Sequence, residues 1–150
     1  MLVQHMLAEA RKRLATISVD APLAEAARLL SYEHLNLVAV CNQDGKLIGV
    51  ISDSDIVHCV SACHPECRRA CTLGAEAAMT REVIACTLED SLREVWAKMK
   101  DHDLRHLPVL DEAGGPIGIL FARDVLRVLL EEAQIEEQDL KDYFLGLGYH

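Results

Sequence analysis

The chain has 150 residues, of which 51% are hydrophobic and 26% charged, a composition typical of a globular protein with one domain or two small halves. Its formal net charge of −9 makes nucleic acid an unfavourable partner, because an acidic surface repels the phosphate backbone. The sequence has no apolar run long enough to span a membrane, and its start lacks the basic and apolar regions of a signal peptide, so we expect a cytoplasmic protein with no membrane partner.

The first half of the chain carries the signals of three short strands and two helices. A strand is predicted at residues 16–18, with a helix after it. Residues 36–40 and 47–51 are predicted as two further strands, joined by a hairpin turn at 42–45. A second helix is expected to begin near Asp53, so the predicted order is strand, helix, strand, strand, helix.

The second half begins with a predicted strand at 83–86, followed by a well-marked helix. Ser91 is a suitable N-cap residue, and Glu94, three positions later, completes the capping-box pattern. Apolar side chains then recur at the spacing of a single helix face. These are Leu92, Val95, Trp96 and Met99.

Two strands and a long helix are predicted for the rest of the second half. The strands at 107–110 and 117–120 flank a turn at 111–115. A helix opens at 122–124 and continues through Leu140, with acidic residues on one face. Large apolar residues gather in the tail that follows, and we expect them to dock on the chain's own repeat or on a partner subunit. These are Tyr143, Phe144, Leu145, Leu147 and Tyr149.

Residues 15–59 and 84–128 form an internal sequence repeat, with a constant offset of 69 residues and no gap. One such unit is too small to bury much core alone, so we expect an α+β fold in which tandem β-α-β-β-α repeats pack sheet to sheet with pseudo-two-fold symmetry. A ligand site is expected near the interface between the repeats. The identical pairs are Leu23 and Leu92, Glu25 and Glu94, Leu35 and Leu104, Val40 and Val109, Gly45 and Gly114, Ile48 and Ile117, Gly49 and Gly118, and Asp55 and Asp124.

Three stretches of the repeat carry a resemblance to a known family. Residues 49–55 read Gly-Val-Ile-Ser-Asp-Ser-Asp, residues 118–124 read Gly-Ile-Leu-Phe-Ala-Arg-Asp, and residues 105–111 read Arg-His-Leu-Pro-Val-Leu-Asp. The first fully matches the pattern Gly-apolar-apolar-Ser/Thr-x-x-Asp of the CBS domain (cystathionine-β-synthase domain), and the second matches it except at the hydroxyl position. The third resembles the basic-basic-Leu-Pro-Val-x-Asp strand of that family. The closest likeness is to small bacterial stand-alone CBS-pair proteins.

The resemblance implies a regulatory, energy-sensing module rather than an enzyme. CBS pairs commonly bind AMP, ADP, ATP or S-adenosylmethionine in clefts between the repeats, and two pairs usually associate into a homodimer. An effector protein, unidentified here, would be regulated by such a module. No P-loop, Gly-x-Gly-x-x-Gly, serine elbow or His-Glu-x-x-His motif is present to favour an enzyme.

The repeat and the resemblance divide the chain into four parts. Residues 1–64 are the first CBS repeat with its N-terminal lead-in, and residues 65–78 are a linker that contains cysteines. Residues 79–130 are the second repeat, and residues 131–150 are an acidic C-terminal helix with an apolar tail.

Ser52 and Asp55 are the candidate binding pair of the first repeat. A carboxylate near the start of a helix can accept hydrogen bonds from both hydroxyls of a ribose, and the helix N-terminus favours a phosphate. Ser52 could add a hydroxyl donor to that phosphate. The alternative interpretation is that the two residues only cap the helix.

The second repeat carries Asp124 at the equivalent position but departs from the pattern. Phe121 replaces the hydroxyl residue, and it could stack on a base or simply fill the pocket. Arg123 could supply charge to a phosphate, as could Arg105 and His106, whose counterparts in the first repeat are uncharged. We therefore expect two unequal clefts, the second weaker or empty.

A cysteine cluster offers a second functional hypothesis, a metal or redox sensor. Thiolates that converge tetrahedrally would suit zinc, although Pro65 interrupts a continuous helix through the segment. The alternatives are redox chemistry and a linker whose cysteines are small buried apolar residues. A third hypothesis is a dimerisation module without a ligand. The candidate metal ligands are Cys59, Cys63, Cys67 and Cys71.

Overall fold

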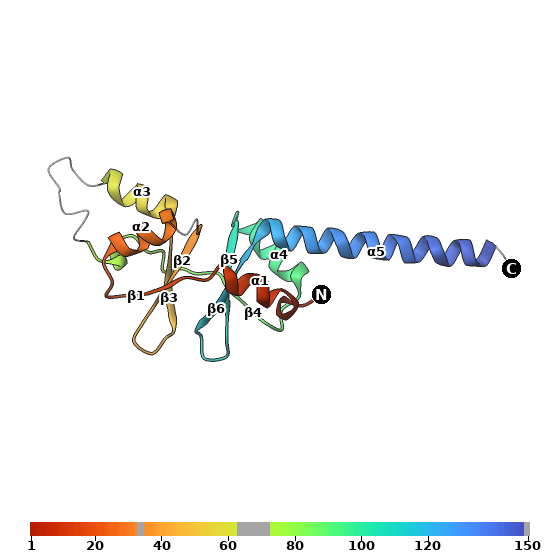
Figure 1. Cartoon of the computed structure of the whole chain (residues 1–150), viewed down its shortest axis with the longest axis horizontal. Coiled ribbons are helices and arrows are strands. Elements are labelled where there is room, and N and C mark those ends of the chain that lie inside the picture. Colours follow the sequence, from red (N-terminus) through yellow and green to blue (C-terminus); the bar gives the residue numbers. More distant parts are fainter. Residues whose placement is uncertain (33–34, 63–72, 149–150) are drawn as a thin grey trace.

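Each half of the chain forms one three-stranded sheet with helices packed against it (Figure 1). The computed structural model describes residues 1–32, 35–62 and 73–148. In the first half the sheet order is β1-β2-β3, with β1 parallel to β2 and β2 antiparallel to β3. Its elements are β1 (Thr16–Ser18), α2 (Leu23–Tyr32), β2 (Leu37–Cys41), β3 (Leu47–Ser52) and α3 (Asp53–Ala62).

The second half repeats this arrangement, as the sequence repeat predicts. The sheet order is β4-β5-β6, again with one parallel and one antiparallel pair. Ser91 caps α4 and Glu94 bonds back to the Ser91 N–H, so the predicted capping box is confirmed. The elements are β4 (Cys86–Thr87), α4 (Leu92–Asp101), β5 (His106–Leu110), β6 (Pro116–Phe121) and α5 (Ala122–Gly148).

The predicted strand at 83–86 is wrong in its extent, since β4 covers only Cys86–Thr87. Proline chemistry explains the difference. In the first half the N–H of Ala39 donates to the carbonyl of Ala15 at 2.9 Å and extends the parallel ladder. The counterpart of Ala39 is Pro108, which has no N–H to donate. The parallel pairing of the second half therefore begins later.

The segment that leads into each half packs on the opposite half. The 3₁₀ helix η1 (Val3–Met6) and α1 (Leu7–Lys12) contribute Val3, Met6 and Ala10 to the core of the second half. The 3₁₀ helix η3 (Ala75–Ala77) contributes to the core of the first half, together with Met79. This exchange ties the two repeats together, because neither core is complete without a segment that precedes the other repeat.

Gly49 and Gly118 make these exchanged contacts possible. A Cβ on Gly118 would lie 2.7 Å from the Cβ of Ala10, and a Cβ on Gly49 would lie 2.7 Å from the Sδ of Met79. Both distances are shorter than nonbonded heavy atoms tolerate. The repeated glycine of the motif is therefore needed for close packing against the exchanged segment.

A small third cluster of apolar side chains lies where the two halves meet. Leu37 and Val50 of the first sheet pack with Ile119 and Phe121 of the second. The two hairpins also meet through the backbone, where the Leu47 N–H donates to the Gly114 carbonyl at 2.9 Å. The expected sheet-to-sheet packing of the repeats is thus present.

Helix α5 is longer than predicted and leaves the body of the molecule (Figure 1). The expected change from helix to a separate apolar tail does not occur through Gly148, and contacts between Glu137 and Lys141 and between Gln138 and Asp142 support the helix there. Residues 133–146 are all exposed, so docking of this segment on the chain's own repeat is not observed. Tyr149 lies outside the described residues. No helix in the described part of the chain is both long and apolar enough for a membrane span.

Candidate functional site

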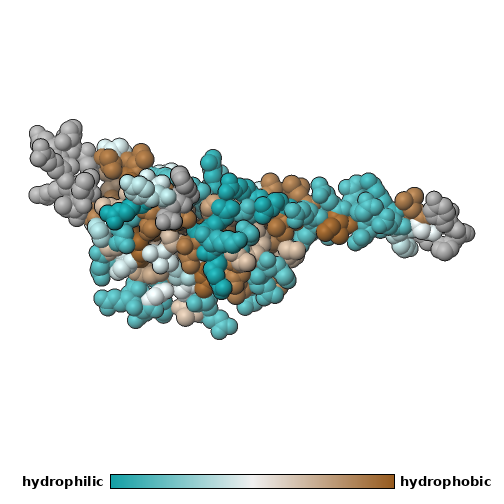
Figure 2. Space-filling model, in the orientation of Figure 1, coloured by the Kyte–Doolittle hydropathy of each residue, from teal (hydrophilic) through white to brown (hydrophobic). Residues whose placement is uncertain are grey.

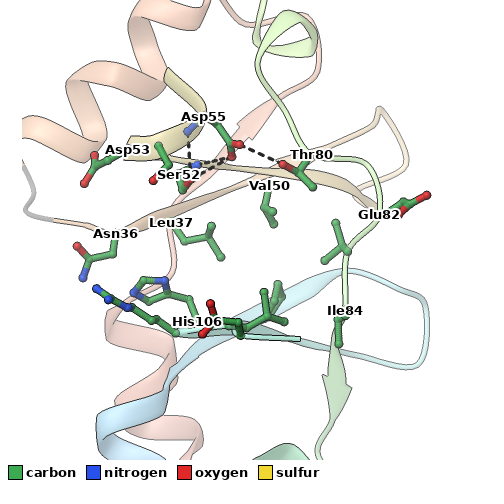
Figure 3. A pocket seen from close by; sticks show the side chains of 16 residues that line it. Asn36, Leu37, Val50, Ser52, Asp53, Asp55, Thr80, Glu82, Ile84 and His106 are labelled. Carbon is green, nitrogen blue, oxygen red and sulfur yellow. Dashed lines mark hydrogen bonds between the residues drawn. The ribbon is translucent and has the colours of Figure 1, made fainter. Parts of the chain in front are cut away.

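A cavity of about 560 Å³ lies between the two halves, within the range of small-molecule sites in proteins (Figure 3). One wall is the junction of β3 and α3, which contributes residues 52–55. The opposite wall is the start of β5 and the loop before it, residues 103–106. Residues 82–84, which lead into the second half, also line the cavity, as do Asn36, Leu37, Val50, Thr80 and Pro108. The cavity is therefore shared by both repeats, as expected from the sequence.

Asp55 is held in place at the edge of this cavity by hydrogen bonds to both carboxylate oxygens. The N–H and the hydroxyl of Ser52 donate to Asp55 Oδ2 at 2.9 and 3.1 Å. The hydroxyl of Thr80 donates to Asp55 Oδ1 at 3.1 Å. Oδ2 thus accepts two hydrogen bonds and Oδ1 accepts one, so Oδ1 keeps lone-pair capacity for a further donor, and the side chain is only half-buried. The carboxylate is thus preorganised to accept a hydroxyl donor from a molecule in the cavity.

Ser52 also caps the helix, because the N–H of Asp55 donates to the Ser52 hydroxyl at 3.3 Å. The capping role proposed as the alternative interpretation is therefore real, and it fixes the same carboxylate that faces the cavity. Thr80 was missed by sequence reasoning. Its counterpart in the first repeat is Arg11, so the repeat gave no signal for a hydroxyl at this position.

Arg105 and His106 line the wall opposite Ser52 and Asp55, which places all four predicted residues around one cavity (Figure 3). Burial lowers the pKa of His106 from 6.5, and the positive charges of Arg105, Arg123 and Arg13 lower it further, against a smaller opposing effect of Asp53. The imidazole is therefore neutral at neutral pH. Its ring packs edge to face on Phe121, with 4.7 Å between ring centroids.

A second, smaller hollow of about 410 Å³ adjoins the first. The two share Asn36, Arg105 and His106, and the second adds Arg123 at the N-terminus of α5. Acidic residues among the described side chains line only the first cavity, whereas the second is bounded by arginines. Charge therefore changes sign along the combined cleft, from acidic near Asp55 to basic near Arg123. The acidic residues of the first cavity are Asp53, Asp55, Glu82 and Asp103.

Asp124, the counterpart of Asp55, lies in a different environment. Its carboxylate is buried, and Arg13 Nη2 lies 3.0 Å from Oδ2 while Arg127 Nη2 lies 3.7 Å from Oδ1. The Arg13 guanidinium also covers the ring of Phe121, with 3.9 Å from Cζ to the ring centroid. Asp124 lines neither hollow, so the structure does not bring it together with the other predicted residues.

Phe121 is 5% exposed and packs with Leu37 and Ile119. Its ring also lines the second hollow, so both roles considered for it, stacking on a base and filling the pocket, stay open. Phe121 and Arg13 pack together beside Asp124, at the position equivalent to the open space beside Asp55 in the first half. Sequence reasoning identified the aromatic ring but not Arg13, which lies in the lead-in segment before the repeat begins.

The cysteine hypothesis falls mostly outside the described residues. Cys63, Cys67 and Cys71 are not described, and Cys59 is half-buried in α3. Among the described residues, no three His, Cys, Asp or Glu side chains are grouped as a metal site. Burial raises the pKa of Cys86 to about 12, with a further rise from Asp90 and a smaller opposing effect of Lys98. Cys86 is therefore a core residue, as the sequence predicts.

Comparison with known proteins identifies a repeated domain. The family model of the CBS domain matches residues 7–62 and again residues 75–131. The homoserine O-acetyltransferase of Methanococcoides burtonii is 29% identical over 118 residues, which are 79% of this chain and 22% of that protein. The chain therefore spans about a fifth of the length of that relative.

Solved structures share the fold. The CBS-domain pair of protein MJ0100, in complex with 5′-methylthioadenosine and S-adenosyl-L-methionine, matches with a TM-score of 0.71 at 24% identity, over 88% of this chain and 98% of that one. The structure of CBSX2 in complex with AMP matches with a TM-score of 0.73 at 22% identity, again over 88% and 98% of the two chains.

Proposed function

The chain belongs to the CBS-domain family, and we propose that it is a regulatory module that binds an adenosine ligand in the cleft beside Asp55. The observation that carries the proposal is the Asp55 carboxylate, fixed by Ser52 and Thr80 at the rim of a cavity of about 560 Å³. Two similar solved structures are complexes with adenosine compounds, and the ribose is common to all of these compounds.

The ribose is the part of the ligand that Asp55 recognises. Oδ1 can accept a hydrogen bond from one of the two vicinal hydroxyls, and the hydrogen bonds from Ser52 and Thr80 remove the need to order the acceptor on binding. The base then lies among the apolar lining of the cavity, which includes Leu37, Val50 and Ile84.

The phosphate end of a nucleotide points toward the basic end of the cleft. Arg105 lines both hollows, and a guanidinium can donate two parallel hydrogen bonds to a phosphate. Arg123 and the N-terminus of α5 lie at the end of the same path. AMP, ADP and ATP fit this arrangement of charge, with the larger members reaching further toward Arg123.

One ligand binds per chain under this proposal. The pseudo-symmetric position beside Asp124 is taken by Arg13 and Phe121, both of which belong to the chain itself. The two repeats thus have different roles, since the first offers a carboxylate to the ligand and the second keeps its carboxylate in an internal ion pair.

Two copies are further proposed to associate as a homodimer through the helices that follow β3 and β6. Exposed apolar side chains lie on both helices: Val57 and Val60 are 66% and 51% exposed, and Leu126 and Leu130 are 38% and 54% exposed. Such a face is more apolar than a stable monomer normally leaves in water. Ligand binding would change the association of the two chains, and an effector protein would recognise that change.

Calorimetric titration of the full chain with adenosine, AMP, ATP, S-adenosylmethionine and NADH tests the binding proposal. At least one adenosine compound is expected to bind with a stoichiometry of one. Asp55→Asn and Asp55→Ala are expected to lower its affinity about ten- to hundred-fold, which corresponds to about 1.5–3 kcal/mol. Asp44→Ala, in the exposed turn after β2, is the matched control for the loss of one acidic residue. Absence of binding to every compound would remove the proposal, and unchanged affinity in both Asp55 variants would move the site elsewhere.

A further inference from the structure

The part of α5 beyond residue 131 lies outside the repeated domain. The second CBS match ends at residue 131, but α5 continues to Gly148 as a helix that projects into solvent (Figure 1). Residues 133–146 are all exposed, and Figure 2 shows apolar patches on the projecting part. A single helix of this length is marginal in water without tertiary contacts. Nothing in the described part of the chain covers residues 133–146, so the segment calls for a packing partner.

Apolar residues of α5 line one side of the helix as a seam with the spacing of a coiled coil, interrupted by Glu137. Successive seam positions alternate between four and three residues apart, which keeps them on one side of the helix. Val125 and Leu129, on the adjoining face of the helix, pack into the body of the second half. The seam positions are Leu126, Leu130, Ala133, Glu137, Leu140 and Phe144.

The seam starts on the body and runs onto the projecting segment, with Glu137 as its one polar position. Leu126 and Leu130 belong to the exposed apolar face that we assign to the homodimer. Leu140 and Phe144 continue the same stripe and are 58% and 64% exposed. Continuity with that face indicates that the partner of the projecting segment is the same as the partner of the body, a second copy of this chain.

We propose that the projecting half of α5 pairs with its copy in a second chain as a parallel, in-register coiled coil. The inference rests on the proposed homodimer and adds to it an interface beyond the CBS fold. Charge at the flanking positions supports the parallel direction. Glu136 and Lys141 flank the seam and are five residues apart. In a parallel pair, Glu136 of one helix lies beside Lys141 of the other, so the symmetric dimer would hold this ion pair twice.

An antiparallel pairing that brings Lys141 of one chain against Arg127 of the other is less favourable in charge, because it places like charges opposite each other. A parallel pairing avoids this contact. The strong acidity of the segment would also suit a basic helix of another protein, and the tests below separate that outcome from self-pairing.

Glu137 is the polar interruption of the seam. Lys141 Nζ lies 3.3 Å from Glu137 Oε1 within the same helix and partly neutralises it. In a parallel pair two Glu137 side chains would face each other near the axis, which weakens the association but fixes the register. The expected coiled coil is therefore reversible, and Glu137→Leu is expected to tighten it at least about ten-fold.

Sedimentation equilibrium of full-length variants tests the proposal. Leu140→Glu places a charge in the seam and is expected to raise the dimer dissociation constant at least about ten-fold. Ile135→Glu is the matched control, because Ile135 is 61% exposed but lies on the opposite side of the helix from the seam. Equal effects of the two variants would overturn the proposal.

A charge reversal tests the direction of pairing. Glu136→Lys is expected to weaken the dimer, and the double variant Glu136→Lys with Lys141→Glu is expected to recover it, because the contact across the interface is restored with its charges exchanged. If the double variant does not dimerise more tightly than both single variants, Glu136→Lys and Lys141→Glu, the parallel register is overturned.

The outcomes for the coiled coil and for the body dimer are distinct. A wild type that is monomeric at micromolar concentration would overturn both. If Val57→Glu dissociates the dimer but Leu140→Glu and Glu137→Leu leave its dissociation constant unchanged, the body interface is supported and the coiled coil is overturned.

Discussion

Arg13 lies 3.0 Å from Asp124, so the carboxylate that the repeat places opposite Asp55 is already occupied by the chain's own guanidinium. The pseudo-symmetric counterpart of Arg13 is Glu82, which lines the open cavity and carries the opposite charge. Arg13 and Glu82 thus differ in charge at equivalent lead-in positions, and this difference leaves the Asp124 carboxylate paired and the Asp55 carboxylate available to a ligand. The asymmetry of the two clefts follows from the segments that precede the repeats as much as from the repeats themselves.

Removal of Arg13 is expected to expose the second carboxylate. Arg13→Ala should lower the free energy of unfolding by about 1–3 kcal/mol, because buried Asp124 keeps only the longer contact with Arg127. Combined with Phe121→Ser, which restores the hydroxyl of the motif, it should raise the ligand stoichiometry from one toward two. Calorimetry measures the stoichiometry and urea denaturation the stability.

Arg11→Ala is the control for this pair of changes, since Arg11 is an exposed cation in α1, two residues before Arg13. It should alter neither quantity. A double variant that folds, keeps the first site and still binds one ligand would show that more than Arg13 and Phe121 closes the second cleft.

The sequence predicted the repeat architecture because periodic apolar positions and turn residues are local signals. The hairpins, the helix caps and the third strands are each specified by a few neighbouring residues, as Ser91 and Glu94 illustrate. The short β4 could also have been anticipated, since Pro108 removes the N–H that a longer parallel ladder requires.

The contribution of Arg13 to closing the second cleft could not be predicted from such local signals. Arg13 and Asp124 are far apart in the sequence, and the lead-in segments are exchanged between the repeats, so no local pattern links the two residues. Thr80 was missed for the same reason. Ser52, Asp55, Arg105 and His106 were identified because they lie within motifs of the family, and the structure brings these four around one cavity.

The two motif glycines should differ in their tolerance of alanine. Gly118→Ala places a Cβ against Ala10, 3.0 Å from its carbonyl carbon, where backbone must move. Gly49→Ala meets the flexible side chain of Met79 first, although the Thr80 carbonyl oxygen lies at 3.0 Å. We expect Gly118→Ala to destabilise by about 1–3 kcal/mol and Gly49→Ala by less, measured by thermal or urea unfolding.

Gly146→Ala is the matched control, because a Cβ there meets nothing within 4 Å. Alanine is the better helix former, so this change should be neutral or stabilising by up to about 1 kcal/mol. A larger loss for Gly49→Ala than for Gly118→Ala would contradict the assigned packing.

Cys86 should resist alkylation in the folded protein. Burial first, and Asp90 second, raise its pKa to about 12, so almost no thiolate exists at pH 8. Iodoacetamide followed by peptide mass spectrometry should label Cys86 slowly in native protein and quickly in urea. Cys59, half-buried in α3, is the internal comparison. Native labelling of Cys86 as fast as that of Cys59 would contradict the buried position.

His106 should make stability and ligand binding depend on pH. Its folded-state pKa is lowered from 6.5, first by burial and then by Arg105, Arg123 and Arg13, whereas Asp53 opposes the shift. The unfolded state therefore takes up a proton before the folded state does. The contribution of this group to stability is present above pH 6.5 and is lost as pH falls from 6.5 through the lower folded-state pKa.

A phosphate-bearing ligand should change this behaviour. An anion beside Arg105 offsets the positive charges that lower the pKa of His106, so the bound protein should hold a proton more readily and affinity should rise as pH falls from 7.5 to 6. Adenosine, which has no phosphate, should show no such rise. NMR titration of the His106 ring protons with and without AMP measures the pKa directly, and His106→Gln should remove both the stability slope and the pH dependence of AMP affinity. A pKa of His106 that does not move when AMP binds would place the phosphate away from Arg105 and His106.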